Sequence, residues 1–342
     1  MPSNSTTTAV PDAFRAYVFE NFGNALSEIK LRTDFPQKPL GPTQVRIKVH
    51  SAAFNPIDYK LVEVGQAFLP EPPSAEKPIR LGFDVAGTLV EVGSEVKRED
   101  LKIGAAVYAM AFFGGTGSFA EYFDLDAHYV ASKPKNLSFS KSAGLPLVGL
   151  TSYQALVTFG KLKKGDRVLI LGGSSGTGGI AIQIAKALGA SFVAATTSAR
   201  NTELVKSFGA DQVIDYTKEK WGDVLEDHSI DLIYDCGVEP LSWNDAAQRV
   251  LKRDTGIFVT IEPHLTPKAS SIGATFHSII TDSNAKDLAE LTKLVEAGKL
   301  FIPIDSVHPF ENLMDAVKLQ KSGHARGKII LQVLPESEQF TS

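Results

Sequence analysis

The segment 167–190 constrains the fold of this chain more than any other. A short apolar run, Val168–Leu171, is followed by the glycine-rich turn GGSSGTGG at 172–179 and then by an apolar helical run. Strand, glycine turn and helix in this order are typical of the βαβ unit of a parallel sheet. Glycines let the backbone approach a pyrophosphate, and the first amides of the helix can donate to it. The segment therefore predicts a dinucleotide-binding turn.

Two registers of this turn stay open. The glycines at 173, 176 and 179 fit G-x-x-G-x-x-G, and Gly176, Gly178 and Ala181 fit G-x-G-x-x-A. A single match to such a pattern is weak evidence, but its position between a strand and a helix makes it more specific. The alternative is a glycine turn that only packs a helix against a sheet.

The same turn also carries the pattern of a serine hydrolase. Gly172-x-Ser174-x-Gly176 matches the nucleophile elbow, which uses the same strand, turn and helix. A hydrolase would need a downstream acid and histidine, and the nominal candidates are Asp231 or Asp235 with His264 or His277. The glycines continue beyond the elbow, which favours the nucleotide interpretation and leaves the hydrolase as a minor alternative.

The residues after the next predicted strand indicate which dinucleotide is bound. An NAD-specific enzyme usually places Asp or Glu there, about 20 residues after the turn, to accept the ribose hydroxyls. This chain has TTSARN at 196–201, and its first acid is Glu203. Hydroxyl, amide and guanidinium groups can donate to a 2′-phosphate, which a carboxylate would repel. The sequence therefore favours NADPH over NADH, although the same hydroxyl and amide groups could simply cap the following helix.

The hydrophobic patterns change along the chain and predict an α/β protein with two domains. Residues 1–137 contain short β-type runs broken by Pro and Gly, among them a proline-rich loop at 70–78. Residues 138–297 alternate helical patterns with short apolar strands, which predicts a doubly wound parallel sheet. Residues 298–342 end in a β-type run, 328–333, and are expected to return to the first domain.

Composition excludes several classes of function. A chain of 342 residues is long enough for about two domains, and its net charge of −4 gives no footprint for nucleic acid. Two uncharged stretches, 103–120 and 168–185, are too rich in Gly for membrane spans. The first ten residues carry no basic or long apolar signal, so a cytoplasmic location is expected. Cys236 is the only cysteine, which excludes an internal disulfide and any zinc site with two thiolates.

With these patterns in place, much of the chain resembles the zinc-independent medium-chain dehydrogenase/reductases, in particular the quinone oxidoreductase (zeta-crystallin-like) and enone reductase branch. The resemblance covers about residues 15–333 and rests on phrases in one order: AFNPIDYK at 53–60, GFDVAG at 82–87, SFAEY at 118–122, LPLVGLTSY at 145–153 and GKIIL at 327–331. It implies a GroES-like β-barrel catalytic domain built from both chain ends and a Rossmann domain between them. It also implies a homodimer and a small quinone or α,β-unsaturated carbonyl as substrate.

The resemblance also implies that no metal is used. Zinc alcohol dehydrogenases of this superfamily place a Cys ligand where this chain has Asn55 and a His-Glu pair where it has Phe83 and Asp84. Quinones and enones are already electrophilic, so hydride transfer to them needs no Lewis acid. Positioning of NADPH and a flat acceptor is then the main task of the protein.

The expected site residues follow from the turn and from the resemblance. The catalytic candidates are Asn55, Tyr59 and Lys60. The candidates for cofactor binding are Asn55, Lys60, Thr151, Gly173, Ser175, Gly176, Thr177, Gly178, Thr197, Ser198, Arg200, Asn201, Tyr216, Cys236, Gly237, Val238 and Lys328. The candidates for substrate contact are Tyr59, Phe112, Phe113 and Phe276, with Phe119 as a further aromatic, because flat acceptors favour aromatic walls. Core packing is the ordinary alternative for each aromatic and for Cys236.

A second hypothesis keeps the fold and drops the chemistry. Some relatives in this branch accumulate as crystallins or bind RNA, so the chain could be an NADPH-binding structural or regulatory protein with little activity. The charge balance argues against RNA, and the NPIDYK segment at 55–60 favours an enzyme. One-electron quinone reduction and C=C reduction stay equally open.

Overall fold

The strand-rich beginning of the chain and its last strands build two sheets. The computed structural model describes residues 10–67, 69, 71–112, 117–239, 241–262 and 266–334. A three-stranded antiparallel sheet has the order β2-β1-β4, formed by β1 (Ala13–Phe19), β2 (Lys30–Pro36) and β4 (Ile79–Arg80). A seven-stranded sheet has the order β15-β16-β3-β5-β6-β8, and β7 also pairs with β3. Its strands are β3 (Gln44–Phe54), β5 (Asp84–Val92), β6 (Ala106–Met110), β7 (Tyr122–Asp126), β8 (Val130–Ser132), β15 (Ile304–Pro309) and β16 (Lys328–Gln332).

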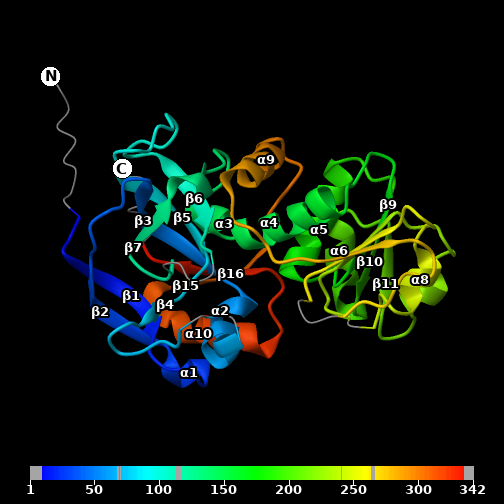
Figure 1. Cartoon of the computed structure of the whole chain (residues 1–342), viewed down its shortest axis with the longest axis horizontal. Coiled ribbons are helices and arrows are strands. Elements are labelled where there is room, and N and C mark those ends of the chain that lie inside the picture. Colours follow the sequence, from blue (N-terminus) through cyan, green and yellow to red (C-terminus); the bar gives the residue numbers. More distant parts are fainter. Residues whose placement is uncertain are drawn as a thin grey trace. The chain divides into compact units, whose positions relative to one another are not determined.

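The last strand returns to the beginning of the chain. β16, red in Figure 1, lies antiparallel beside the blue β3, with Ile329 opposite Phe54 and Gln332 opposite Ser51. Buried residues fill β3 along most of its length, as expected for a strand that is central in its sheet. The two chain ends therefore share one core, which is the arrangement that a GroES-like domain requires.

Short helices accompany these sheets. They are α1 (Ala25–Glu28), α2 (Pro56–Val64), α3 (Phe139–Ala143) and α10 (Leu313–Ser322), with 3₁₀ turns η1 (Gly65–Ala67), η2 (Ala127–Tyr129) and η5 (Phe310–Asn312). Together with the sheets they form one compact unit, made of the described residues within 1–146, 283–289 and 304–342. The second unit comprises residues 147–282 and 290–303.

The second unit contains a six-stranded parallel sheet with the order β11-β10-β9-β12-β13-β14. Its strands are β9 (Arg167–Leu171), β10 (Phe192–Thr197), β11 (Gln212–Asp215), β12 (Leu232–Asp235), β13 (Ile257–Thr260) and β14 (Thr275–Ser278). Its helical elements are α4 (Pro146–Tyr153), the π-helix η3 (Gln154–Phe159), α5 (Gly176–Ala187), η4 (Ala199–Asn201), α6 (Thr202–Ser207), α7 (Trp221–Val224) and α8 (Ala246–Val250). Helix α9 (Ala285–Glu296) has residues in both units. The prediction of an α/β protein with a GroES-like part and a doubly wound parallel sheet is confirmed.

The strand order places a reversal point next to β9. The chain moves outward from β9 through β10 to β11 on one side, and the other side begins with β12. In open parallel sheets, ligands bind at the carboxyl ends of the strands where the order reverses. The carboxyl ends of β9 and β12 lead directly into Gly172 and Cys236.

The core of the second unit accounts for the apolar run of β9, in which Val168 to Leu171 are all buried. Leu169 and Leu171 pack in one hydrophobic cluster with Trp243 of the β12–α8 connection, Val250 of α8 and Phe258 of β13. Residues two apart on a strand point to the same face, so Val168 and Ile170 occupy the opposite one. Within the described residues, no helix is both long and apolar enough to cross a membrane.

Candidate functional site

The predicted site residues divide between the two units, and each group is described within its own unit. In the second unit, the glycine-rich turn begins at Gly172, whose φ of +85° favours glycine. Its amide donates to Thr196 Oγ1 at 2.9 Å, and the amide of Gly173 donates to the carbonyl of Thr196 at 2.8 Å. These bonds fix the turn to the end of β10. The glycine-rich turn and the segment 196–201, which the sequence predicts to bind the pyrophosphate and the 2′-phosphate, therefore lie together.

Close backbone packing explains why glycine is needed in the turn. A Cβ added to Gly178 would lie 2.2 Å from the carbonyl oxygen of Gly172, and a Cβ on Gly172 would lie 2.8 Å from the Cα of Gly237. A Cβ on Gly173 would meet the side chain of Ala195 at 2.8 Å. Close packing within the chain thus requires glycine at these positions, and the turn is left as a backbone cradle without side chains, which fits the approach of a pyrophosphate.

The helix that follows presents donors to this cradle. Ser175 is the N-cap of α5, and its hydroxyl accepts the amide of Gly178 at 2.9 Å. Among the described residues, the amides of Gly176 and Thr177 have no partner within the chain. Free amides at the N-terminus of a twelve-residue helix are donors for an anion. The donor set therefore fits a dinucleotide phosphate.

Polar groups after β10 form the second part of the cradle. Thr197 is 1% exposed and Asn201 is 9% exposed. Their Oγ1 and Oδ1 atoms are buried without a hydrogen-bond partner in the described part of the chain. The Asn201 amide donates to Ser174 Oγ at 3.2 Å. Buried polar atoms without partners are costly, and a ligand with hydroxyl and phosphate groups would satisfy them.

Three further candidates surround this position. Arg200 is exposed and forms no ion pair with any described residue, and Ser198 is half-buried. Tyr216 is 59% exposed, and its amide donates to the carbonyl of Thr197 at 3.1 Å. Glu203, the first acid, pairs instead with Lys206 at 3.0 Å on the surface of α6. The segment after Thr197 therefore carries one exposed cation, Arg200, and hydroxyl groups, and the Glu203 carboxylate is engaged by Lys206.

The residues after β12 complete the second-unit site. The Cys236 thiol lies 3.1 Å from the carbonyl oxygen of Leu171 and 3.8 Å from Ser175 Oγ. Burial raises the pKa of this thiol to about 12, so it is a neutral, packed group rather than a nucleophile. Val238 has a φ of +58° and is 43% exposed, which presents its backbone at the end of β12. Asp235 is fully buried, and burial raises its pKa to about 6, although the amide of Glu239 and the hydroxyl of Thr260 oppose the shift.

The hydrolase alternative does not fit this geometry. Asp231 precedes β12 and lies at the edge of the sheet opposite to the turn, where it pairs with Lys252 at 2.6 Å. The Asp235 carboxylate accepts from Thr260 and Glu239, and the His277 ring packs on Phe159 at 5.5 Å. Neither acid is bonded to a histidine in the described residues, so no triad forms around Ser174. His264 lies outside the described residues.

In the first unit, the NPIDYK segment and the last strand meet in a buried polar cluster. Asn55, Asp84 and Lys328 are 1%, 0% and 4% exposed. The Lys328 ammonium donates to Asn55 Oδ1 and forms an ion pair with Asp84 Oδ2 at 3.2 Å, and the Asn55 amide donates to the same Asp84 oxygen at 3.0 Å. Three buried polar side chains thus satisfy one another, which the pairing of β16 with β3 makes possible.

Asp58 supports this cluster by holding the backbone of Asn55. Its Oδ2 accepts the amide of Asn55 at 2.7 Å, so it holds the first turn of α2. Burial raises the pKa of this carboxyl well above its usual range, and the neighbouring Asp84 adds to the shift. Asp58 therefore caps the start of α2, whereas the Asn55 side chain bonds to Asp84 and Lys328.

The remaining candidates lie at different places. Thr151 of α4 bonds to Thr281 Oγ1 at 2.7 Å within the second unit. In the first unit Lys60 is exposed, and Tyr59 is half-buried beneath the Lys321 ammonium, 5.5 Å from the ring centroid. Phe112 is 43% exposed and contacts the Tyr129 ring at 5.2 Å.

Two aromatic candidates lie in hydrophobic cores. Phe276 of β14 packs against Trp243 and Phe258, with ring centroids 5.2 and 5.9 Å apart. Phe119 is fully buried and stacks on Phe54 at 5.5 Å. Their ordinary fate, core packing, accounts for both side chains. Phe113 lies outside the described residues.

Comparisons with known proteins place these features in a family. Residues 41–135 match the alcohol dehydrogenase GroES-like domain, and residues 208–331 match a family described as zinc-binding dehydrogenase. The chain is 35% identical to the 2-methylene-furan-3-one reductase of Solanum lycopersicum, over 97% of this chain and 82% of that protein. It is 36% identical to the NADPH-dependent alkenal/one oxidoreductase, chloroplastic, of Arabidopsis thaliana, over 96% of this chain and 81% of that protein. The quinone oxidoreductase from Coxiella burnetii superposes with a TM-score of 0.81 at 31% identity, covering 94% of this chain and 99% of that one.

The zinc that one of these family descriptions implies does not fit the donors present. A catalytic zinc needs three Cys, His or carboxylate ligands, and no such group of three occurs among the described residues. The only cysteine of the chain, Cys236, lies in the other unit. In the first unit the Asp84 carboxylate is already paired with the Lys328 ammonium, a cation that would repel a metal ion. The sequence, the fold and the relatives agree: the chain belongs to the medium-chain dehydrogenase/reductase superfamily, in the branch of quinone and enone oxidoreductases.

Proposed function

We propose that the chain is an NADPH-dependent oxidoreductase that reduces quinones or α,β-unsaturated carbonyls without zinc. The observation that carries the proposal is the cradle at the carboxyl ends of β9, β10 and β12. It combines a backbone that only glycine allows at Gly178 with free helix amides and with unpartnered polar atoms at Thr197 and Asn201. Relatives whose names include alkenal/one and quinone oxidoreductase support the choice of acceptor.

NADPH, when bound, supplies the hydride. The backbone of Gly173 and the amides of Gly176, Thr177 and Gly178 would hold its pyrophosphate, with Ser175 capping the helix. The edge formed by Thr197, Ser198, Arg200, Asn201 and Tyr216 would hold the adenosine ribose and its 2′-phosphate. Cys236, Gly237 and Val238 would lie along the inner ribose, where the thiol stays neutral and contributes packing.

The buried cluster of the first unit would act by positioning. Lys328 and Asp84 neutralise each other, and Asn55 bridges them, so the loop that leads from β3 into α2 is held in one arrangement. Helix α2, which this loop leads into, carries Tyr59 and Lys60, which we propose as contacts of the substrate and the cofactor. Thr151 of the second unit is a further proposed cofactor contact. Phe112, which is exposed, is a further proposed substrate contact.

Deuterium transfer tests the proposed chemistry. The protein is incubated with [4-²H]NADPH carrying the label on either face of C4, together with ethyl vinyl ketone, and the product is analysed by NMR. We expect that only one of the two labelled forms of NADPH transfers its deuterium, and that the saturated ketone product then carries one deuterium at its β-carbon. In a parallel sample, 9,10-phenanthrenequinone should consume NADPH directly. Label at the carbonyl carbon, or no consumption of NADPH with either acceptor, would contradict the proposal.

We further propose that the chain works as a cytoplasmic homodimer with the domain boundaries expected from the sequence. β14 is the last strand of the parallel sheet, and the following Ile280 is 72% exposed, which offers an edge for strand pairing between two copies. Sedimentation velocity tests the dimer, and a charged residue in place of Ile280 should yield monomers. Several relatives carry chloroplastic or mitochondrial in their names, so fractionation of the source cells tests the location.

A further inference from the structure

A pocket in the first unit lies apart from the residues discussed so far. It has a volume of about 400 Å³ and is bordered by the sheet β2-β1-β4 and by β7. Phe14 of β1, Phe35 of β2, Ile79 of β4 and Leu69 line its apolar part. Glu71, Pro72, Lys77 and Pro78, which belong to the proline-rich surface loop predicted at 70–78, contribute part of the wall. The volume is within the range of small-molecule sites.

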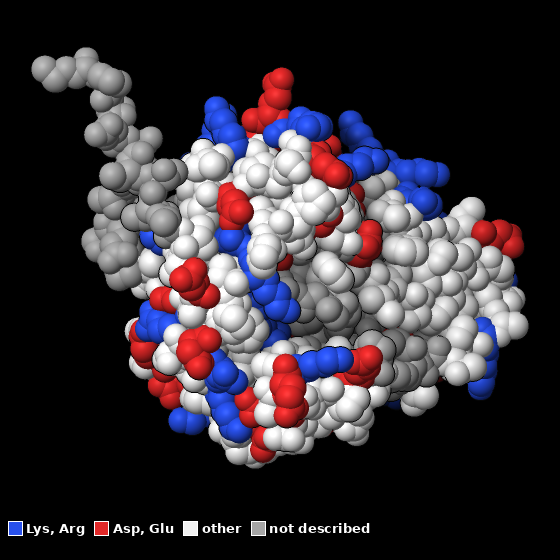
Figure 2. All heavy atoms as spheres, turned by 60° about the vertical axis from the view of Figure 1, so that its left-hand side comes forward, with Lys and Arg blue, Asp and Glu red and all other residues white. Residues whose placement is uncertain are grey.

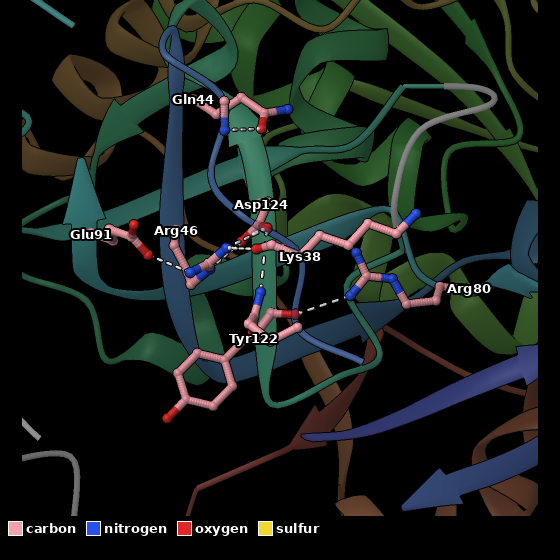
Figure 3. Close-up of polar contacts among 9 residues, drawn as sticks. Lys38, Gln44, Arg46, Arg80, Glu91, Tyr122 and Asp124 are labelled. Atoms are coloured by element: carbon pink, nitrogen blue, oxygen red, sulfur yellow. Dashed lines mark hydrogen bonds and ion pairs between the residues drawn. The ribbon is translucent and has the colours of Figure 1, made fainter. Parts of the chain in front are cut away.

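Arg80 is the central polar group of this pocket. Its guanidinium carbon lies 5.5 Å from the centroid of the Phe14 ring and 5.2 Å from that of Phe35. One amino group donates to the carbonyl of Tyr122 at 3.2 Å, as Figure 3 shows. In the described part of the chain, no carboxylate pairs with Arg80. Burial lowers the pKa of the guanidinium to about 10, and the nearby Asp124 carboxylate opposes this shift. A half-buried cation without a paired carboxylate gains from an anionic partner.

The nearest acid is already occupied. Asp124 lines the pocket, but its two oxygens accept from Nε and Nη2 of Arg46 at 2.8 and 3.0 Å. Arg46 is 3% exposed and also bonds to Glu91 and to the carbonyl of Lys38, so it is held in place on every side (Figure 3). Both oxygens of Asp124 are therefore engaged by Arg46, which lies outside the pocket and shares its charge with Glu91.

The charges that line the pocket leave an excess of positive charge. Lys77 pairs with Glu71 at 3.5 Å, whereas Lys38 forms no ion pair with a described residue. In Figure 3 the Lys38 side chain extends past the Arg80 guanidinium. On the face drawn in Figure 2, acidic and basic side chains are interspersed. The excess of positive charge is therefore a property of the pocket and not of that whole face. Lys38 and Arg80 together make a local site for one anion.

We propose that this pocket binds a small organic monocarboxylate with an apolar body. The planar guanidinium of Arg80 would take the carboxylate through its unpaired N–H groups, and the Lys38 ammonium would add a second, solvent-exposed contact. The rings of Phe14 and Phe35 and the side chains of Leu69 and Ile79 would enclose the apolar body. A dianion such as phosphate would meet Asp124 and Glu71 as well, so a single negative charge fits better.

The pocket is separate from the proposed reaction site. It shares no residue with the cluster of Asn55, Asp84 and Lys328 or with the glycine-rich turn. Arg46, which holds Asp124, precedes Asn55 by nine residues on or next to β3, roughly 30 Å along an extended strand. The proposal therefore does not depend on the proposed oxidoreductase function.

Calorimetric titration of the full-length protein with 4-phenylbutyrate tests the proposal. Its neutral amide, 4-phenylbutanamide, is the matched ligand control. We expect the acid to bind with a stoichiometry of one per chain and the amide to bind about tenfold more weakly or not at all, because the charged hydrogen bonds are lost. Saturating NADPH should leave the affinity for the acid unchanged, which distinguishes this pocket from the cofactor site.

Three variants complete the test. Arg80→Met should weaken binding of the acid about tenfold or more, and Lys38→Met, which changes an exposed side chain and leaves the core intact, should weaken it severalfold. Arg32→Gln on β2, whose side chain pairs with Asp34 outside the pocket, should bind like the unmodified protein. Equal binding of acid and amide, no heat with millimolar acid, unchanged binding in both pocket variants, or displacement by NADPH would each overturn the proposal.

Discussion

Lys328 and Asp84 show how single residues define the first-unit site. An ammonium and a carboxylate that are both almost fully buried stabilise each other only as a pair, because either charge alone would be left without solvent or partner. Asn55 completes the pair by offering its oxygen to the ammonium and its amide to the carboxylate. The pair explains how a dehydrogenase fold can keep this position ordered with residues that do not suit zinc.

Removing one partner of this pair should be costly. Lys328→Met leaves the Asp84 charge buried, so we expect a loss of about 3–5 kcal/mol in the free energy of unfolding, measured in urea. The double variant with Asp84→Asn should recover part of that loss. Lys318→Met, which breaks an exposed pair with Asp315, is the control and should cost less than about 1 kcal/mol. A single-variant loss no larger than the control would refute the account of the cluster.

The pH dependence of stability should contain a contribution from Asp235. Burial raises the pKa of this carboxyl to about 6, so the folded protein holds the proton more tightly than the unfolded chain. Stability is therefore lost as the pH rises from about 4 to about 6, and the loss is complete above that range. Asp235→Asn cannot ionise, so its stability relative to the wild type should increase by up to about 3 kcal/mol between pH 4 and pH 7. A pH-independent difference in urea titrations would show that Asp235 does not titrate in this range.

Arg200 should decide the preference for the phosphorylated cofactor. In Arg200→Ala an exposed guanidinium three residues after Thr197 in the sequence is lost, so we expect KM for NADPH to rise about tenfold while KM for NADH changes little. Lys206→Ala removes a nearby charge that is already paired with Glu203 and serves as the control. An equal rise of KM for NADPH and for NADH would mean that Arg200 acts on folding and not on the 2′-phosphate.

At the scale of elements, the β9–turn–α5 unit is the most local feature of the chain and was predictable from it. Glycine spacing, the apolar strand and the helix are contiguous in sequence, and the structure adds the reason, which is the contact between Gly172, Gly178 and Gly237. The sequence did not choose between the two glycine registers, because Gly237 is remote and the close contacts depend on tertiary packing. The strands β2 and β14 were also not predicted, since strands that are largely exposed have weak hydrophobic patterns.

Crowding the turn should separate cofactor binding from folding. In Gly178→Ala the added Cβ meets the carbonyl of Gly172, so we expect the turn to shift, NADPH affinity to fall about tenfold or more, and stability to fall by about 1–3 kcal/mol. Gly298→Ala is the control, because its φ of +69° strains alanine while nothing lies within 4 Å of the new Cβ. Fluorescence titration with NADPH should show the loss only in Gly178→Ala. Unchanged affinity there would mean that the turn does not hold the pyrophosphate.

For the whole molecule, the feature that creates the first-unit site is the return of the last strand of the chain to its first strands. The β-type run near the end predicted this return, and β16 indeed pairs with β3. That pairing brings Lys328 to Asn55, yet the buried ion pair itself was beyond the sequence, because it depends on the register of two strands more than 270 residues apart. The pocket around Arg80 was equally hidden, since its walls come from four strands and a loop that no local pattern connects.

The measurement that tests the central claim most directly is the oxidation of NADPH at 340 nm by protein treated with EDTA. The acceptors are ethyl vinyl ketone, 1,4-benzoquinone and propanal, and NADH is tested in parallel. The account predicts turnover of the ketone or the quinone, none of the aldehyde, and a clear preference for NADPH. Activity that disappears with EDTA and returns with zinc, turnover of the aldehyde alone, or tight NADPH binding without turnover of any acceptor would contradict it.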